Sequence, residues 1–236
     1  PEQASDTTET GPDLQTAARF LGWDFLGSLA LGAAFGLAPL MVTASDGAAA
    51  TASYHLAWSF AYSVYLVGRA MSVSLVAEGA TLPDRLPRLM ADTLFHTLLL
   101  VSSAVLVVFV FAPLIMAVFG KAYVAEGAPV LRVLVLACLP WSFTTIYCAV
   151  VRVRRQTRSV AMVQLGTLAV FVGVSATLVT TMGAFGVALG WLAAHSLVCL
   201  AIFARHVLIN GFEALVDRIL ALAGPALALL GSDPRL

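Results

Sequence analysis

Hydrophobic residues in this chain form long continuous runs, without the alternation of a strand or the polar stripe of a soluble helix. A helix needs about 20 apolar residues to cross a hydrocarbon layer of roughly 30 Å. Four such runs lie at about 20–42, 53–77, 93–119 and 129–151. They predict four membrane-spanning helices, in which Asp24, Arg69 and Arg132 are the charged residues.

A fifth run is long enough for two helices. From Ser159 to Ala204 the chain has no Asp, Glu, Lys or Arg. The sequence Gly183-Ala-Phe-Gly186 near its middle predicts a break, with helices at about 159–182 and 185–203. Continuous runs favour helices over a β-barrel. The sequence therefore predicts an all-α membrane protein, a bundle of about six transmembrane helices over residues 15–210.

The two ends of the chain differ from this core. Residues 1–14 are polar and acidic and contain Gly11-Pro12, which predicts a linker. Residues 211–236 combine a short apolar run with several charges and Pro225. This tail is predicted to lie in the membrane interface as an amphipathic helix or, less favoured, to begin another span. The chain starts at Pro1 without a signal-peptide pattern, so we expect a fragment of a longer protein.

Composition supports a bilayer as the solvent. Hydrophobic residues make up 60% of the chain and charged residues 11%, against about a quarter charged in soluble domains. That charge is too little to cover the surface of a core of this size. The formal net charge is zero, which gives no reason to expect a nucleic-acid partner.

The basic residues fall on one predicted side of the membrane. That side carries Arg19, Arg85, Arg88, Arg152, Arg154, Arg155, Arg158, Arg205, Arg218 and Arg235. The opposite connections carry only Lys121. Because cytoplasmic loops are enriched in Lys and Arg, this side is predicted to be cytoplasmic, with both termini inside. Short outer turns are expected near Asp46, Lys121 and Gly183.

Several short motifs occur in a fixed order. They are Tyr54-His-Leu-Ala57, Phe119-Gly-Lys-Ala-Tyr123, Ala128-Pro-Val-Leu-Arg-Val-Leu134, the basic turn Arg152–Arg158, and Gly183-Ala-Phe-Gly-Val-Ala188. In this order and spacing they resemble the C-terminal half of polysaccharide exporters. These exporters are the oligosaccharide-lipid flippases of the multidrug/oligosaccharidyl-lipid/polysaccharide (MATE-like) superfamily.

The resemblance covers roughly residues 15–210 and carries expectations about function. It implies two six-helix lobes around a central cavity, with this chain as the second lobe and an N-terminal lobe missing. It also implies alternating-access translocation of a polyprenyl-pyrophosphate-linked oligosaccharide across a bacterial cytoplasmic membrane. The expected partners are this lipid-linked oligosaccharide, membrane lipid and the missing lobe. An Ala-, Val- and Arg-rich, Lys-poor composition suggests a GC-rich bacterial genome.

Two charges within predicted spans are candidate site residues. Arg69 lies towards the cytoplasmic end of the second helix, where it either snorkels to the headgroups or lines a cavity. In a cavity its planar guanidinium suits a pyrophosphate or an acidic sugar, so Arg69 is the substrate-binding candidate. Asp24, next to Trp23, is either an interfacial carboxylate or a site for ion coupling.

Other polar residues have less specific interpretations. His55, His96 and His195 lie in spans and are expected to be neutral and hydrogen-bonded between helices. The Arg152–Arg158 cluster is expected to set topology and to bind anionic lipid. Arg132 and Glu126 are expected at headgroup level.

Four functions remain open from the sequence. The favoured one is the lipid-linked oligosaccharide flippase, and a drug/cation antiporter of the same superfamily is the first alternative. A membrane-embedded glycosyl- or acyltransferase needs an acid/base pair or a long outer loop, and the sequence shows neither. A non-transporting scaffold of a polysaccharide assembly complex is the fourth. No nucleotide-binding loop, metal cluster or nucleophile–base motif occurs, so no enzyme activity, cofactor or metal is predicted.

Overall fold

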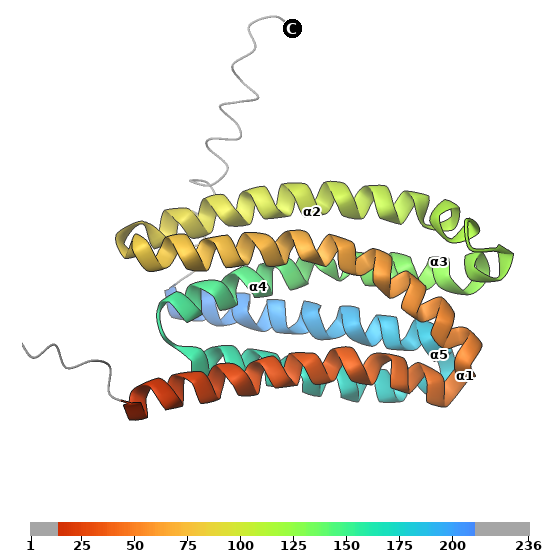
Figure 1. Cartoon of the computed structure of the whole chain (residues 1–236), viewed down its shortest axis with the longest axis horizontal. Coiled ribbons are helices and arrows are strands. Elements are labelled where there is room, and N and C mark those ends of the chain that lie inside the picture. Colours follow the sequence, from red (N-terminus) through yellow and green to blue (C-terminus); the bar gives the residue numbers. More distant parts are fainter. Residues whose placement is uncertain (1–13, 211–236) are drawn as a thin grey trace, which may run out of the picture.

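The computed structural model describes residues 14–210, and within them it is helical without strands (Figure 1). The elements are α1 (Leu14–Thr81), η1 (Pro83–Arg85), α2 (Leu86–Ala117), α3 (Lys121–Leu136), α4 (Cys138–Val153) and α5 (Thr157–Asn210). The predictions of a polar linker over 1–14 and of an interfacial or partly spanning tail over 211–236 lie almost entirely outside the described residues.

Four helical segments are long and apolar enough to cross a membrane. They are Ala17–Thr81, Pro83–Ala117, Lys121–Val153 and Thr157–His206. At about 1.5 Å per residue, the 68 residues of α1 and the 54 residues of α5 would extend far beyond a bilayer core of roughly 30 Å. Each of these two helices instead folds back on itself (Figure 1). Long apolar helices were predicted at these positions, and that part of the prediction is confirmed.

Glycines make the reversals at one end of the molecule. Gly47 within α1 has φ 81° and ψ −173°, and Gly183 within α5 has φ 55° and ψ −134°. Gly120, between α2 and α3, has φ 124°. These backbone conformations are strained for any residue with a Cβ atom. The three glycines lie where the sequence predicted short turns.

Asp46 joins two of these reversals. Its Oδ2 accepts a hydrogen bond from the backbone N–H of Ala184 at 2.8 Å, so it caps the second half of α5. A Cβ atom at Gly183 would collide with the Asp46 carboxylate. The first and last long helices of the described chain are therefore fastened together at this end.

The fourth predicted span differs in detail from the structure. It was expected to begin near Pro129, but the helix already begins at Lys121. It is also divided at Ala137 into α3 and α4. Pro140 lies in the first turn of α4, where its missing N–H costs little, and it cannot continue the hydrogen-bond ladder of α3.

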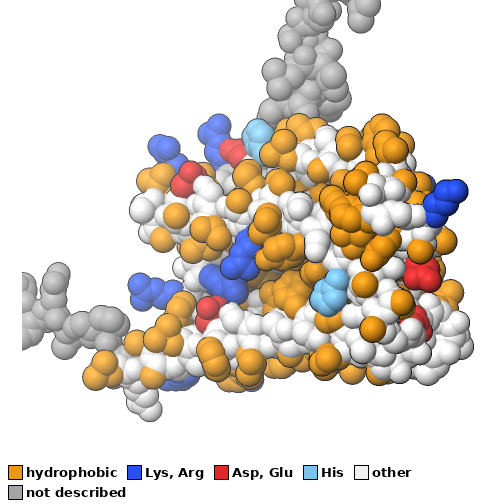
Figure 2. Space-filling view, turned by 45° about the vertical axis from the view of Figure 1, so that its right-hand side comes forward, with side chains coloured by type: hydrophobic (Ala, Val, Ile, Leu, Met, Phe, Trp, Pro, Cys, Tyr) orange, Lys and Arg blue, Asp and Glu red, His pale blue; other side chains and the backbone are white. Residues whose placement is uncertain are grey.

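Burial differs sharply between the helices. The most apolar window of Lys121–Val153 is 67% buried, and that of Pro83–Ala117 only 17%. The segment α3–α4 is therefore central, and α2 lies at the periphery. Large apolar side chains of α2, such as Leu99, Leu106 and Leu114, are exposed. Hydrophobic side chains also cover much of the face in Figure 2. An apolar surface of this kind suits contact with lipid.

A hydrogen-bonded aromatic pair occupies the core. The Tyr65 hydroxyl donates to the carbonyl of Leu134 at 3.0 Å and accepts from the indole N–H of Trp191 at 2.9 Å. Trp191 is fully buried and contacts the rings of Phe35 and Trp58 at centroid distances of 5.2 and 5.1 Å. This cluster connects α1, α3 and α5.

The glycine at the α5 reversal gives a test of the fold. Gly183→Ala is expected to lower stability by about 1–3 kcal/mol, because alanine is strained at this φ and ψ and displaces Asp46. Gly173→Ala in the same helix is the control, since a Cβ there meets nothing within 4 Å. Thermal unfolding in detergent should separate the two variants. Equal melting temperatures would contradict the reversal at Gly183.

Candidate functional site

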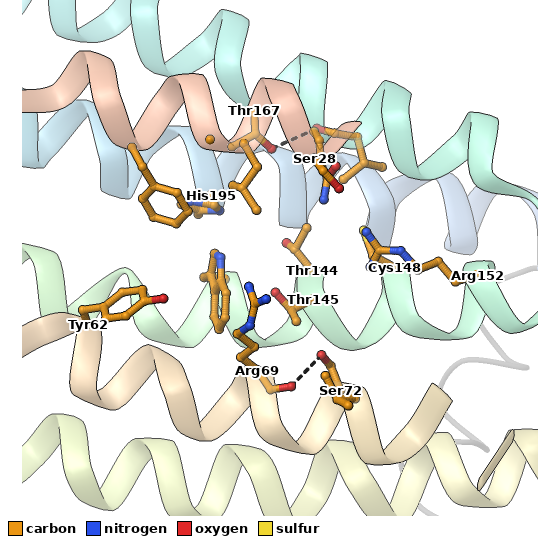
Figure 3. A pocket seen from close by; sticks show the side chains of 17 residues that line it. Ser28, Tyr62, Arg69, Ser72, Thr144, Thr145, Cys148, Arg152, Thr167 and His195 are labelled. Atoms are coloured by element: carbon orange, nitrogen blue, oxygen red, sulfur yellow. Dashed lines mark hydrogen bonds between the residues drawn. The ribbon is translucent and has the colours of Figure 1, made fainter. Parts of the chain in front are cut away.

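A cavity of about 480 Å³ lies between five helical segments. Its wall is formed by both halves of α1, by α4 and by both halves of α5, whereas α2 and α3 contribute nothing to it. Polar side chains from each of these segments point into it (Figure 3). They are Ser28, Tyr62, Arg69, Ser72, Thr144, Thr145, Arg152, Gln164, Thr167 and His195.

Arg69 lines this cavity from the second half of α1. Figure 3 shows its guanidinium reaching across towards the α4 wall that carries Thr145. Within residues 14–210 no Asp or Glu oxygen lies within 4.0 Å of it. The side chain is exposed and lines the cavity, and its position relative to the lipid headgroups stays a prediction. Its role in substrate binding stays a prediction.

Arg152 is the second charged residue of the cavity wall, and it holds Asp24. Its Nε donates to Asp24 Oδ1 at 2.8 Å, and the two side chains are 29% and 36% exposed. Arg152 stands in the last turn of α4, where a cation also interacts favourably with the helix dipole. Asp24 itself is not part of the cavity wall. The role of Asp24 in ion coupling stays a prediction, but its partner is now defined.

Sequence reasoning missed this pair. The residues are 128 positions apart, and Arg152 looked like one of several loop arginines. Arg154 and Arg155 fit that description, because both are exposed at the end of α4. Arg152 differs because it still lies within α4, on the face that also carries Thr145 and Cys148. Helical spacing from those residues was the available signal.

The histidines behave differently from one another. His195 is 2% exposed and lines the cavity, yet neither ring nitrogen has a hydrogen-bond partner in the described chain. The expectation of an interhelical hydrogen bond is wrong for His195. His55 is exposed, and His96 is exposed with its Nδ1 2.6 Å from the carbonyl oxygen of Asp92.

Arg132 has a defined partner within the bundle. It is half-exposed, and its Nε donates to the carbonyl of Phe109 at 3.1 Å, while its expected position at headgroup level stays a prediction. Its guanidinium also lies 5.4 Å from the Phe109 ring centroid. Arg132 therefore packs α3 against α2.

A second cavity, of about 540 Å³, lies at the end with the glycine reversals. It carries the carboxylates of Asp46 and Glu126. Asp46 caps α5, and Glu126 lies 3.3 Å from the Ser53 hydroxyl, which donates to it. Both carboxylates therefore already serve helix packing.

The two cavities differ in charge. The charged side chains of the first are Arg69 and Arg152, and those of the second are Asp46 and Glu126. Figure 2 shows most of the basic side chains at one end of the molecule and in the hollow of this face. The first cavity thus suits an anionic ligand that can accept hydrogen bonds from guanidinium and hydroxyl groups.

The fold matches half of a known transporter structure. It is similar to the inward-facing conformation of a multidrug resistance MATE family transporter of the MOP superfamily, with a TM-score of 0.64 and 17% sequence identity. The match covers 91% of this chain and 50% of the transporter, so the chain spans about half of its length. No family model matches the sequence, and no curated protein matches it. At this identity the likeness shows the fold alone: the described helices are arranged like one half of that transporter.

The Asp24–Arg152 pair can be tested by a double-mutant cycle. Asp24→Asn and Arg152→Gln, singly and together, should give a coupling of about 0.5–1 kcal/mol in thermal unfolding, because the pair is about one-third exposed and partly screened. Arg88 and Asp92 provide the control: their 3.9 Å contact lies on exposed side chains, so their coupling should be near zero. Equal coupling in the two cycles would contradict this geometry.

Proposed function

We propose that this chain is one lobe of a transporter that moves an anionic, polyprenyl-pyrophosphate-linked oligosaccharide across a membrane. The observation that carries the proposal is the charge of the first cavity, whose two charged wall residues are Arg69 and Arg152. Guanidinium groups bind phosphate oxygens in a bidentate manner, and this contact is stronger away from bulk water. A pyrophosphate has two phosphate groups, so it offers phosphate oxygens to both guanidinium groups.

The rest of the cavity wall suits the other parts of such a substrate. Hydroxyls from Ser28, Ser72 and Thr144 can bond to a glycan, and the apolar surface around the bundle suits a polyprenyl chain. The likeness to half of a MATE family transporter supports transport as the class of activity. A second lobe of similar size then faces this cavity, and the two lobes open it to one side of the membrane at a time.

Six crossings follow from this proposal. Helices α1 and α5 each cross twice, with their reversals at Gly47 and Gly183, while α2 and the α3–α4 segment cross once. The end rich in arginine faces the cytoplasm of a bacterial inner membrane. Arg152, in the last turn of α4, is then near the cytoplasmic mouth, and Arg69, which is exposed and lies near Thr145 (Figure 3), is further from that mouth.

Asp24 gains a specific coupling role in this scheme. It shares Arg152 with the substrate, so protonation of the carboxyl or a bound cation frees the guanidinium for a phosphate. The guanidinium of an arginine has five N–H donors, and Arg152 uses the one on Nε for its bond to Asp24. Substrate binding and the charge on Asp24 are thereby linked.

A drug/cation antiporter is the second candidate, because the similar structure is a multidrug resistance transporter. A carboxylate on the cavity wall favours a cationic substrate. Among the described residues that line the first cavity there is no carboxylate, and that of Asp24 is bound by Arg152. The charge of this lobe therefore favours the anionic substrate.

Replacement of Arg69 tests the proposal. Arg69→Gln is expected to reduce transport about 10- to 100-fold, the size of a lost hydrogen bond to a charged group. Arg69→Lys should keep part of the activity, because it retains the charge without the planar fork. Lipid-linked oligosaccharide on each leaflet is measured in a deletion strain complemented with each variant of the full-length protein. Arg154→Gln, at an exposed arginine outside the cavity, should complement fully.

The outcomes separate the candidate functions. Inner-leaflet accumulation in the deletion strain, reversed by wild type and Arg154→Gln but not by Arg69→Gln, supports the proposed transporter. A deletion without accumulation but with increased sensitivity to cationic drugs would favour the antiporter. A deletion with neither effect would leave a scaffold as the better interpretation.

Lys121 allows a test of orientation. It is the single lysine of the sequence and is exposed at the first residue of α3. In intact cells a membrane-impermeant amine reagent should label Lys121, because the proposed topology puts it outside. Mass spectrometry of the peptide that contains it gives the readout, and Lys121→Arg is the control. Labelling only after the membrane is permeabilised would show that Lys121 faces the cytoplasm and that the orientation is the opposite one.

A further inference from the structure

One wall of the first cavity carries buried polar atoms that lack partners. Both ring nitrogens of His195 and the side-chain oxygen of Gln164 have no hydrogen-bond partner in the described chain. Both residues line the cavity from α5. Buried polar atoms are nearly always hydrogen-bonded, so unpaired ones beside a cavity point to a ligand that would complete them.

Surrounding aromatic rings hold His195 in position. Its ring packs edge-on against Trp191 at a centroid distance of 4.7 Å. Trp191 is in turn fixed by the hydrogen bond to Tyr65 and packs against Phe171. The imidazole is therefore held in a preorganised position at the cavity wall, which keeps the cost in conformational entropy low when a ligand binds.

The chemistry of this wall differs from that of the arginine wall. A neutral imidazole has one donor and one acceptor nitrogen, and the Gln164 oxygen is an acceptor. A hydroxyl group can both donate and accept, so it satisfies this set. A phosphate oxygen only accepts and would leave the acceptor atoms unpaired. Figure 3 shows His195 on the opposite side of the cavity from Arg69.

Flat apolar rings complete the same cavity. Phe35, Tyr62 and Trp141 all line it. A sugar ring has hydroxyls at its edge and C–H groups on its faces, so aromatic surfaces with a few placed polar groups are suited to it. We propose that His195 and Gln164, with these rings, form a subsite for an uncharged sugar of the substrate, across the cavity from Arg69 of the proposed pyrophosphate-binding pair (Figure 3). This inference rests on the proposed function.

The test compares two ligands on the full-length protein in detergent. One is polyprenyl pyrophosphate without sugar, and the other is lipid-linked oligosaccharide extracted from the host. His195→Phe keeps a ring against Trp191 and removes both nitrogens. This variant is expected to lower the affinity for the sugar-bearing ligand roughly 5- to 20-fold and the affinity for the bare lipid less than about 2-fold. Arg69→Gln should lower the affinity for both ligands.

Two further variants exclude a purely structural effect. His195→Gln keeps a donor and an acceptor, so it should restore part of the affinity for the sugar-bearing ligand. Ser175→Ala removes another buried, unpaired polar atom, one outside the cavity wall, and should leave both affinities unchanged. His195→Phe should also unfold at a temperature no lower than wild type, because it removes unsatisfied polar atoms from the interior.

Each result decides a specific point. Equal weakening of both ligands by His195→Phe, or no weakening, would overturn the sugar subsite while the proposed function stands. If the phenylalanine variant does not fold, wild type decides the point: equal affinity for the sugar-bearing lipid and for the bare lipid overturns the subsite. If wild type binds neither ligand, the proposed function fails.

Discussion

The hydrogen bonds of the Tyr65 hydroxyl hold together the parts of this lobe that matter for its cavity. One bond reaches the carbonyl of Leu134 in α3 and the other the indole of Trp191 in α5. In a bilayer the apolar surface between helices gives little driving force, so packing and interhelical hydrogen bonds determine which helices meet. Trp191 then orients His195, and Tyr65 lies one helical turn before Arg69 on α1. Both walls of the cavity depend on this buried contact.

Different interactions hold the helices together at the two ends of the molecule: the glycine reversals at one end and the Asp24–Arg152 pair at the other. At one end Gly47 and Gly183 turn the chain within a single residue, and Asp46 fastens α1 to α5. At the other end the link between α1 and α4 is an ion pair that is about one-third exposed. Ion pairs of this exposure are weak and sensitive to salt. The end that carries the ion pair is therefore the more easily opened of the two.

The sequence allowed much of the fold to be predicted, because hydropathy and glycine placement directly reflect the membrane and the turns. The long apolar helices and the turns near Asp46, Lys121 and Gly183 follow from such local signals. The short motifs also pointed to a fold that the structure shares with half of a MATE family transporter. The partner of Asp24 and the isolation of His195 depend instead on which helices become neighbours. No local pattern encodes that.

The packing of α1 against α5 has a consequence for biosynthesis. Gly27 contacts Ala161 and Gln164, Phe35 contacts Trp191, and Asp46 caps α5, so the first described helix needs the last one as its neighbour. A ribosome delivers α1 to the membrane long before α5 is translated. Until then Arg69 lacks its cavity and faces lipid or other protein. The first helix pair therefore completes its packing only when the final helix pair has been made.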